Sequence, residues 1–172
     1  MGGSDKVLVT GGAGFIGSYL VDALLGKGYQ VRVFDSLEPQ VHGEARQVPE
    51  YLNPSAELVV GDVRDRSALK DALQDVDVVF HYAAAVGVGQ SMYQVQRYVD
   101  VNTLGGATLL DILANETHRV RKVIVASSMS TYGEGKYECQ ACGVKYPQLR
   151  PDDQLRQRRW EMVCPECGAE MR

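Results

Sequence analysis

The sequence has no cysteine in its first 138 residues, and its four cysteines all lie between Cys139 and Cys167. Disulfide-stabilised secreted domains spread their cysteines through the fold, whereas a metal site gathers them in one segment. This distribution excludes a disulfide scaffold. It divides the chain into a cysteine-free body and a cysteine-bearing tail.

The sequence also lacks an apolar run of about 18 residues, the minimum for a membrane-spanning helix. Its first residues, MGGSDK, lack the basic and then apolar order of a signal peptide. Basic residues are not in excess, because 18 Lys and Arg stand against 22 Asp and Glu, for a net charge of −4. A nucleic-acid-binding surface spread over the molecule is therefore disfavoured. We expect a cytoplasmic protein with neither membrane nor nucleic acid among its partners.

What remains is an ordinary globular chain of 172 residues, 45% hydrophobic and 23% charged. Such a chain forms one domain, or one domain with a small appendage. Short apolar runs alternate with helical patterns in its body, which predicts a parallel sheet covered on both faces. The predicted strands are 6–10, 30–34, 57–60, 76–82 and 122–126. The predicted helices are 15–25, 67–74 and 98–114, and the polar segment 36–54 is predicted to be a surface loop.

The first predicted strand runs directly into a glycine-rich turn, with Gly11, Gly14 and Gly17 spaced three apart. Such a turn lets the backbone approach a pyrophosphate and lets the following helix direct its free N–H groups at it. Asp35 ends the second strand, where its carboxylate can accept hydrogen bonds from an adenosine ribose. No arginine follows it to offset a 2′-phosphate, so NAD is favoured over NADP. The sequence therefore predicts a Rossmann-type doubly wound sheet, and the alternative is a glycine turn without a ligand.

Five ordered motifs carry a resemblance to a known family. They are residues 7–17 (VLVTGGAGFIG), 61–65 (GDVRD), 81–85 (HYAAA), 101–102 (VN) and 127–128 (SS). Together they resemble the extended short-chain dehydrogenases/reductases, and more narrowly the NAD-dependent nucleotide-sugar epimerases and dehydratases. Segment 85–93 and the cysteine-bearing insertion after Gly133 are similar to the zinc-ribbon subgroup assigned as dTDP-L-rhamnose 4-epimerases.

The resemblance implies roles for individual residues. Ser128 takes the place of the family's catalytic serine or threonine, which hydrogen-bonds the sugar oxygen at the carbon being oxidised; alternatively it satisfies the local backbone. Asp62 and Val63 flank the adenine, although Asp62 can instead cap a turn. The residues implied to bind the cofactor are Gly11, Gly14, Phe15, Ile16, Gly17, Asp35, Asp62, Val63, Ala83, Ala84 and Asn102. His81 is interpreted as a structural, hydrogen-bonded residue, and a buried amide is the alternative for Asn102.

The family's general base, a tyrosine followed four residues later by a lysine on one helix face, has a single formal match in Tyr132 and Lys136. We reject this match because two glycines between them disfavour a helix. The expected pair then lies beyond Arg172. On this interpretation the chain is the N-terminal half of an enzyme and is inactive by itself.

The tail carries two CxxC pairs, Cys139/Cys142 and Cys164/Cys167, and 21 residues separate the pairs. This spacing is typical of a zinc ribbon, whose four thiolates fill the coordination sphere of a structural zinc ion. A redox dithiol fits less well, because neither pair opens a helix. A nucleic-acid-binding ribbon would use the basic cluster at 156–159, which neighbouring acidic residues oppose. We expect residues 1–136 to form an incomplete NAD-binding domain and residues 137–172 a zinc ribbon.

The function implied by the resemblance is epimerisation at sugar C4 through transient oxidation by tightly bound NAD. The implied substrate is a dTDP-linked sugar, and the full-length enzyme is expected to be a homodimer. Two alternatives stay open. One is a nucleotide-sugar 4,6-dehydratase of the same family, and the other is a non-catalytic nucleotide-binding module.

Overall fold

The computed structural model describes residues 5–172; residues 1–4, part of the segment examined for a signal peptide, lie outside them. The chain divides into two compact units, Met1–Ala126 and Ser127–Arg172. Within residues 5–172, no helix has the length and apolar character needed to cross a membrane. The domain boundary expected after residue 136, between the NAD-binding domain and the zinc ribbon, stays a prediction.

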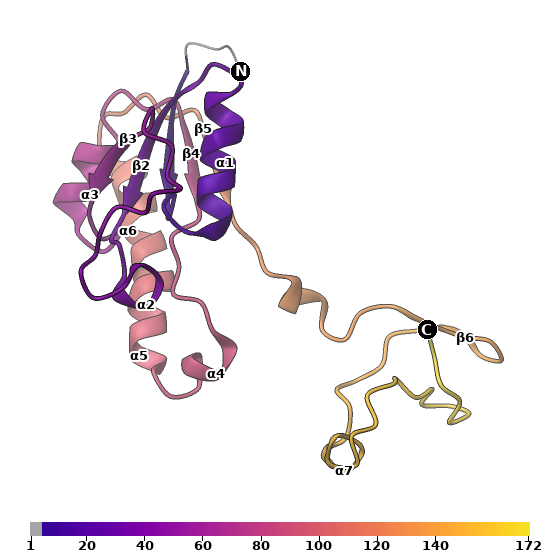
Figure 1. The fold of residues 1–172 in the computed structure, drawn as a ribbon. Helices are drawn as coiled ribbons and strands as arrows, with labels where there is room; N and C mark the ends of the chain where they lie inside the picture. Colours follow the sequence, from indigo (N-terminus) through magenta and orange to yellow (C-terminus); the bar gives the residue numbers. More distant parts are fainter. Residues whose placement is uncertain (1–4) are drawn as a thin grey trace. The chain divides into compact units, whose positions relative to one another are not determined.

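The first unit contains a parallel sheet of five strands in the order β3-β2-β1-β4-β5 (Figure 1). The strands are β1 Lys6–Thr10, β2 Gln30–Asp35, β3 Glu57–Val60, β4 Val78–His81 and β5 Lys122–Val125. The strand order reverses between β1 and β4, which are direct neighbours. In open parallel sheets, ligands bind at the carboxyl ends of the strands at this switch point. The predicted doubly wound α/β fold is confirmed.

The helices of the first unit follow the strands along the chain. They are α1 Phe15–Leu25, α2 Pro39–His42, α3 Arg66–Ala72, α4 Val88–Ser91, α5 Val95–Tyr98, a π-helix Val99–Leu104 and α6 Gly105–Asn115. Helix α1 covers one face of the sheet, while α3 and α6 cover the other (Figure 1).

Alternate residues of β1 supply the two hydrophobic cores. Val7 and Val9 pack in a cluster with Val21 of α1, whereas Leu8 packs in a second cluster with Leu69 of α3 and Leu109 of α6. All six side chains are fully or almost fully buried. Burying one such side chain contributes about 1.5–3 kcal/mol, so both faces of the sheet hold the layers together. This explains why the central strands read as continuous apolar runs.

Arg32 is a buried charge within the otherwise apolar strand β2. Its Nη1 donates to the carbonyl oxygens of Ala72 and Gln74, at 2.7 and 2.9 Å, so it satisfies the end of α3. Its Nη2 lies 3.0 Å from a carboxylate oxygen of Glu57 on β3. Hydrogen-bonded and paired in this way, the guanidinium is tolerated next to the core.

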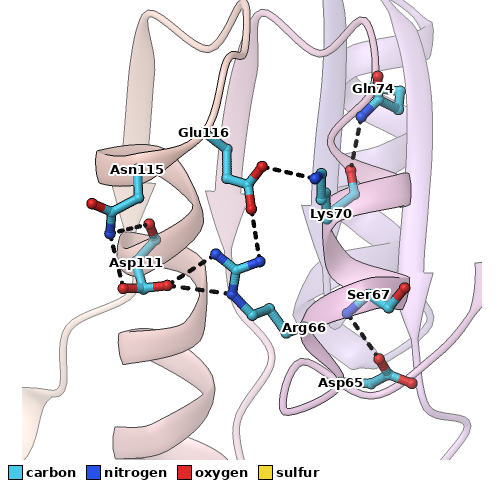
Figure 2. Close-up of polar contacts among 8 residues, drawn as sticks. All are labelled: Asp65, Arg66, Ser67, Lys70, Gln74, Asp111, Asn115 and Glu116. Carbon is cyan, nitrogen blue, oxygen red and sulfur yellow. Dashed lines mark hydrogen bonds and ion pairs between the residues drawn. The ribbon is translucent and has the colours of Figure 1, made fainter.

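An ion-pair network joins α3 to α6 on the surface (Figure 2). Arg66 lies 3.1 Å from Asp111 and 2.8 Å from Glu116, and Lys70 lies 2.7 Å from the other oxygen of Glu116. The Asp65 side chain caps α3 by accepting from the first backbone N–H groups of the helix. The network fixes two helices that follow β3 and precede β5.

Some predicted bounds differ from the structure. Strand β4 begins at Val78 rather than 76, because Asp75 has φ +60 and the N–H of Val76 bonds back to Leu73, so a turn occupies these residues. The helix predicted at 98–114 begins at Val95 and passes through a π-helical segment. Segment 36–54 contains the short helix α2.

The second unit is built around a small hairpin of β6 Tyr137–Cys139 and β7 Gly143–Lys145. Arg172 pairs with Glu138 through two backbone hydrogen bonds. The remaining elements are a 3-10 helix, Met129–Tyr132, and α7 Asp152–Arg156. The buried core of the second unit contains two of the four cysteines and two methionines, namely Cys139, Met162, Cys164 and Met171.

Candidate functional site

Gly11 lies where β1 ends, at the carboxyl edge of the sheet. Its φ is +70°, and a Cβ added there would lie 2.8 Å from the backbone nitrogen of Ala83 beyond β4. Its own N–H donates to the carbonyl of Phe34 on β2 at 2.8 Å. Only glycine fits a left-handed conformation in such close backbone contact. Gly11 therefore brings the ends of three strands together.

Gly14 and Gly17 meet different surroundings. A Cβ on Gly17 would lie 2.2 Å from the carbonyl oxygen of Gly11, so the packing of α1 on the turn requires glycine there. A Cβ on Gly14 would meet nothing closer than 3.4 Å, and its φ is an ordinary −74°. The protein itself does not require a glycine at position 14. An external group approaching the backbone would require one.

Helix α1 begins at this turn without a side-chain cap and without an acidic residue in its first turn. Its first N–H groups therefore keep their partial positive charge for an anion. Phe15 and Ile16, at the start of the helix, are 74% and 62% exposed. The turn thus presents backbone donors beside two exposed apolar side chains. These features fit a dinucleotide pyrophosphate.

Asp35 ends β2 and is almost fully buried. Its Oδ2 accepts from the N–H of Ala13 at 3.0 Å, and its Oδ1 accepts from the N–H of Leu37 at 2.9 Å. The carboxylate thus holds the glycine turn against the loop after β2. Each oxygen retains a further acceptor direction. Asp35 thus has a structural role, and ribose binding by its carboxylate stays a prediction.

The backbone after β3 lies at the same carboxyl edge of the sheet as Asp35. Gly61 donates from its N–H to the carbonyl of Asp35 at 2.9 Å. Asp62 follows, and its carboxylate is paired with Arg64, whose hydrogen bonds lower the pKa of Asp62. Val63 is 4% exposed and belongs to the core, and its place beside the adenine stays a prediction.

His81 ends β4 and is buried, as the structural interpretation predicts. Its Nδ1 lies 2.9 Å from Oγ1 of Thr10, the last residue of β1. Burial lowers the pKa of His81, so the ring is neutral at neutral pH. The same Thr10 oxygen accepts from the N–H groups of Tyr82 and Ala83. The ends of the two switch-point strands are fixed in this way.

Asn102 lies within the π-helix and holds the segment after β4. Its Oδ1 accepts from the N–H of Ala85 at 2.8 Å, and its Nδ2 donates to the carbonyl of the same residue at 3.1 Å. Both halves of the carboxamide therefore bond the backbone of one residue, on its two adjacent peptide units. Ala83 and Ala84 directly precede this clamped residue, and Ala84 is exposed. Asn102 is exposed, so the buried-amide alternative is wrong, and its role beside the cofactor stays a prediction.

Ser128 belongs to the second unit. Its Oγ accepts from the N–H of Ser130 at 3.1 Å and caps the 3-10 helix, which leaves its hydroxyl hydrogen available. Tyr132 is the last residue of that helix, and Gly133 and Gly135 both have positive φ. Tyr132 and Lys136 thus do not share a helix face, which agrees with rejecting them as the base and its lysine.

The four cysteines of the two CxxC pairs form one cluster, in which all Sγ atoms lie within 4.8 Å of one another. Gly143 and Gly168, which follow the second cysteine of each pair, have φ +75° and +73° with open space around them. Glycine is therefore needed for the turn itself. A zinc ion at about 2.3 Å from each sulfur would place the sulfurs about 3.8 Å apart. The cluster fits a tetrahedral zinc site after small adjustments, since the Sγ atoms of Cys139 and Cys167 lie 3.5 Å apart and all pairs lie within 4.8 Å.

The electrostatics of the cluster favour a bound cation. Backbone hydrogen bonds, first from Cys167 and also from Glu166, lower the pKa of Cys164 to about 7. The hydrogen bond with Cys167, together with burial, raises the pKa of Cys142 to about 12. Ionisation of Cys164 to a thiolate is thus favoured, whereas ionisation of Cys142 beside it is disfavoured. A divalent cation would relieve that penalty.

Residues 7–151 match the NAD dependent epimerase/dehydratase family. The chain belongs to this family.

A dTDP-L-rhamnose 4-epimerase from Burkholderia thailandensis is 37% identical over 158 residues, which cover 91% of this chain and 43% of the relative. The crystal structure of UDP-glucose 4-epimerase from Brucella ovis in complex with NAD has a TM-score of 0.65 and 33% identity, and it covers 76% of this chain and 38% of that one. A dTDP-glucose 4,6-dehydratase from Streptomyces venezuelae, with NAD bound, has a TM-score of 0.58 and 35% identity over 69% of this chain and 38% of that one.

The chain spans less than half the length of these epimerase/dehydratase family members. Because the first unit ends at Ala126, a match over 91% of the chain includes most of the cysteine-bearing unit as well. The structure also adds residues that sequence reasoning missed. Thr10 joins β1 to β4, Tyr51 donates to the carbonyl of Ala13 at 2.9 Å, and Arg64 holds Asp62. Thr10 and Arg64 lie inside the recognised motifs, whereas nothing local marks Tyr51.

Proposed function

We propose that this chain is the NAD-binding part of a nucleotide-sugar 4-epimerase acting on a dTDP-linked sugar, as in the dTDP-L-rhamnose 4-epimerases. The observation that carries the proposal is the open face of Gly14 at the uncapped start of α1, next to the carboxylate of Asp35. The match of 91% of the chain to a dTDP-L-rhamnose 4-epimerase supports the choice of reaction.

In this proposal the N–H groups at the start of α1 hold the pyrophosphate, and the carboxylate of Asp35 accepts from the adenosine ribose. A 2′-phosphate would bring negative charge against Asp35, so NAD binds in preference to NADP. Asn102 and Thr10 keep the backbone of 83–85 in place along the dinucleotide.

When bound, NAD supplies an acceptor that takes hydride from sugar C4 and returns it to the opposite face of the ring. Ser128 donates its hydroxyl hydrogen to the oxygen on that carbon, which orients the sugar for hydride transfer. We assign the general base to no residue of this chain, since Tyr132 and Lys136 lack a common helix face. The chain alone should therefore bind NAD without turning over sugar.

The four cysteines would hold a structural zinc ion, because four thiolates leave no open position for a water molecule. The zinc would stabilise the second unit, whose small core contains two of the ligands.

A 4,6-dehydratase is the second candidate, since a dTDP-glucose 4,6-dehydratase has the same fold at 35% identity. Both reactions begin with oxidation at C4, so the residues of this chain serve either one. The product distinguishes them, because a dehydratase releases water from the sugar and an epimerase only inverts C4.

The test is calorimetric titration of the purified chain with NAD and with NADP. We expect one NAD per chain and at least about tenfold weaker binding of NADP, as expected when an acidic residue faces the 2′ position. Absence of NAD binding would contradict the proposal. Incubation of the chain with dTDP-L-rhamnose should leave the sugar unchanged, and epimerised product would show that the base lies within the chain.

A chimera tests the reaction itself. The chain replaces the matching segment of the Burkholderia thailandensis dTDP-L-rhamnose 4-epimerase, and the product is analysed by NMR. We expect C4 inversion, and we expect the same chimera carrying Gly14→Ala to lose it. A 4-keto-6-deoxy product from dTDP-glucose would favour the dehydratase instead.

A further inference from the structure

Side-chain contacts join the segments that follow β2 and β4. Nε2 of Gln40 on α2 donates to Oε1 of Gln90 on α4 at 3.0 Å. Because β2 and β4 are the two neighbours of β1 in the sheet, the joined segments meet beyond the end of β1, where the glycine turn begins (Figure 1). Residues 36–42 and 86–98 thus form the two arms of an arch at the carboxyl edge of the sheet.

The arm after β2 is anchored to the body of the first unit. Leu37 is buried, and its N–H donates to the carboxylate of Asp35. The side chain of His42 is 3% exposed and lies 4.0 Å from the same carboxylate. Beyond this arm, the hydroxyl of Tyr51 donates to the carbonyl of Ala13 in the glycine turn at 2.9 Å. These contacts fix the arm in place.

The arm after β4 is held by polar contacts at the surface. All four residues of α4 are exposed or half-buried. Besides the bond from Gln40, the Gln90 oxygen accepts from the hydroxyl of Tyr98 on α5 at 3.2 Å. Arg97 of α5 pairs with Glu38 of the other arm at 3.0 Å, and both side chains are partly exposed. A short helix that buries so little opens at a small free-energy cost.

Gly87 directly precedes α4 and has φ +131°, a conformation that residues with a side chain rarely adopt. A Cβ there would lie 2.8 Å from Oε1 of Gln90, so the carboxamide of Gln90 packs directly on this glycine. Two residues earlier, Ala85 is held by both halves of the Asn102 carboxamide. The backbone is therefore fixed as far as Ala85, and a hinge for α4 fits at Gly87.

The arch spans the same part of the sheet edge as the ligand of the proposed function. That dinucleotide extends from Asp35 across the glycine turn to the backbone of 83–85. Phe15 and Ile16, at the start of α1 in this turn, are largely exposed, so the arch leaves the turn accessible to solvent. A dinucleotide on the turn would be enclosed between the sheet edge and the joined arms.

We propose that α4 is a lid, hinged at Gly87 and latched by Gln90, which must open for a dinucleotide to enter or leave the glycine turn. The inference rests on the proposed function, because it takes this turn as the place where NAD binds. Exposed polar pairs are individually weak, so the lid opens without unfolding of the sheet. Since the latch joins protein to protein and does not contact the ligand, it slows entry and exit alike and leaves the affinity nearly unchanged.

The test is stopped-flow fluorescence of NADH binding and of NADH displacement by excess NAD, which give the entry and exit rate constants. Gln90→Ala removes both latch bonds and should raise both rate constants by about threefold to tenfold, the effect of losing one or two such hydrogen bonds. The Kd for NADH should change less than about twofold, since it is the ratio of the two constants. Arg97→Gln, which loses the pair with Glu38, should give smaller rises in the same direction.

Two variants at the α3–α6 surface are the matched controls. Gln74→Ala removes a glutamine whose side chain donates to the Lys70 carbonyl at the end of α3. Arg66→Gln breaks ion pairs between α3 and α6 and removes the same charge as Arg97→Gln (Figure 2). Neither should raise the two rate constants. Loss of positive charge by itself slows the entry of an anionic ligand, which is opposite to the effect expected of Arg97→Gln.

Hydrogen exchange reports on the lid without a ligand. The N–H groups of Ser91 and Met92 bond within the segment 87–92, and they should exchange faster in Gln90→Ala. The amides of β1 should keep their wild-type protection, which shows that the sheet is intact. Unchanged exchange at Ser91 and Met92 would show that Gln90 does not latch α4.

The outcomes separate the inference from the function it rests on. If the wild-type chain binds neither NADH nor NAD, the proposed function and this inference both fail. If it binds them and Gln90→Ala leaves both rate constants unchanged, the inference alone fails. A rise in the exit rate alone, with weaker affinity, would also overturn it, because Gln90 would then act as a contact to the ligand rather than as a latch.

Discussion

Thr10 and His81 end the two strands that meet at the switch point, and a hydrogen bond of 2.9 Å joins their side chains. The Thr10 hydroxyl oxygen also accepts from the N–H groups of Tyr82 and Ala83. With both lone pairs of the oxygen engaged, its hydrogen points to Nδ1 of His81. The imidazole proton then resides on Nε2. One buried hydroxyl thus sets a histidine tautomer and the start of the segment that lines the site.

Replacing Thr10 with valine should destabilise the first unit. Valine keeps the shape, but it leaves the N–H group of Ala83 and the Nδ1 atom of His81 without this partner, whereas the N–H group of Tyr82 keeps its bond to the backbone carbonyl of Thr10. A buried group left in this state costs about 1–3 kcal/mol of unfolding free energy. Urea denaturation measures the loss. Thr10→Ser, which keeps the hydroxyl, should be clearly more stable than Thr10→Val, and equal stability of the two would contradict the assignment.

The same hydrogen bond predicts a spectroscopic result. In ¹⁵N NMR at neutral pH, Nε2 of His81 should be protonated and Nδ1 should be unprotonated. Thr10→Val should shift this balance, because Nδ1 loses its donor. A histidine that already carries its proton on Nδ1 in the wild-type chain would show that the bond runs in the opposite direction.

Gly14 and Gly17 should separate ligand binding from folding. Gly17→Ala should cost about 3 kcal/mol or prevent folding, because its Cβ would lie 2.2 Å from a backbone oxygen that cannot move away. Gly14→Ala has room on the protein side, so its stability should stay within about 1 kcal/mol of wild type, the scale of a change at a helix N-cap. Its affinity for NAD should fall at least about tenfold, by the loss of close approach.

Thermal unfolding and calorimetric titration with NAD are measured on both glycine variants. If Gly14→Ala binds NAD as tightly as wild type, the open face of that residue is not the place of the pyrophosphate. If it unfolds as readily as Gly17→Ala, the glycine is structural after all.

The sequence predicted the parts of the fold that follow from local pattern. Helix α1 was predicted at 15–25 and has these bounds, because Gly14 directly precedes the helix and Gly26 directly follows it. The two core faces of the sheet follow from the apolar run of β1, whose alternate residues pack on opposite sides. The π-helix was not predictable, since Val99–Leu104 has ordinary helical spacing and its insertion depends on contacts such as that of Asn102 with Ala85.

The contacts of charged residues could not be predicted from the sequence either. Asp35 was identified by its place after β2, but its bonds to Ala13 and Leu37 depend on how the loops meet. Arg32 interrupts an apolar strand, and only the structure reveals the helix end that it satisfies. Arg64 and Asp62 lie inside a recognised motif, yet the motif does not show that their side chains bond each other.

Glu57 predicts a specific acid sensitivity. It lies 3.0 Å from Arg32 and 2.9 Å from Lys6, and the hydrogen bond from Arg32 is the first cause that lowers its pKa from 4.5. A lowered folded-state pKa means that this stabilisation is complete above pH 4.5 and is lost as the pH falls below it. Because the Glu57 side chain is 49% exposed, the contribution at pH 7 should be less than about 1 kcal/mol.

The measurement is the urea midpoint of wild type and Glu57→Gln between pH 7 and pH 3. The variant should be less stable at pH 7, and the two curves should converge as the pH falls, because protonation of Glu57 removes its charge. Glu50→Gln, at an exposed position outside the sheet, serves as the control and should follow the wild-type curve. A constant gap at all pH values would show that the charge of Glu57 is not what stabilises the sheet edge.

The cysteine cluster predicts one zinc ion per chain and a local response to its removal. Replacing any one of the four cysteines with serine should lower the zinc content well below one, measured by mass spectrometry of the metal. Cobalt(II) in place of zinc should give the intense visible bands of a tetrahedral four-thiolate site. Zinc well below one per wild-type chain would contradict the site and favour the redox alternative.

Chelation then shows what the metal stabilises. Met162 and Met171 share a buried cluster with Cys139 and Cys164, so their methyl NMR signals should lose dispersion when a chelator removes zinc. The two cores of the first unit contain no cysteine, so the methyl signals of Leu8 and of the other residues in these cores should not change. Because zinc binding supplies folding free energy where a small core cannot, the second unit should unfold on chelation while the first unit stays intact. Unchanged methionine signals would mean that the second unit folds without its metal.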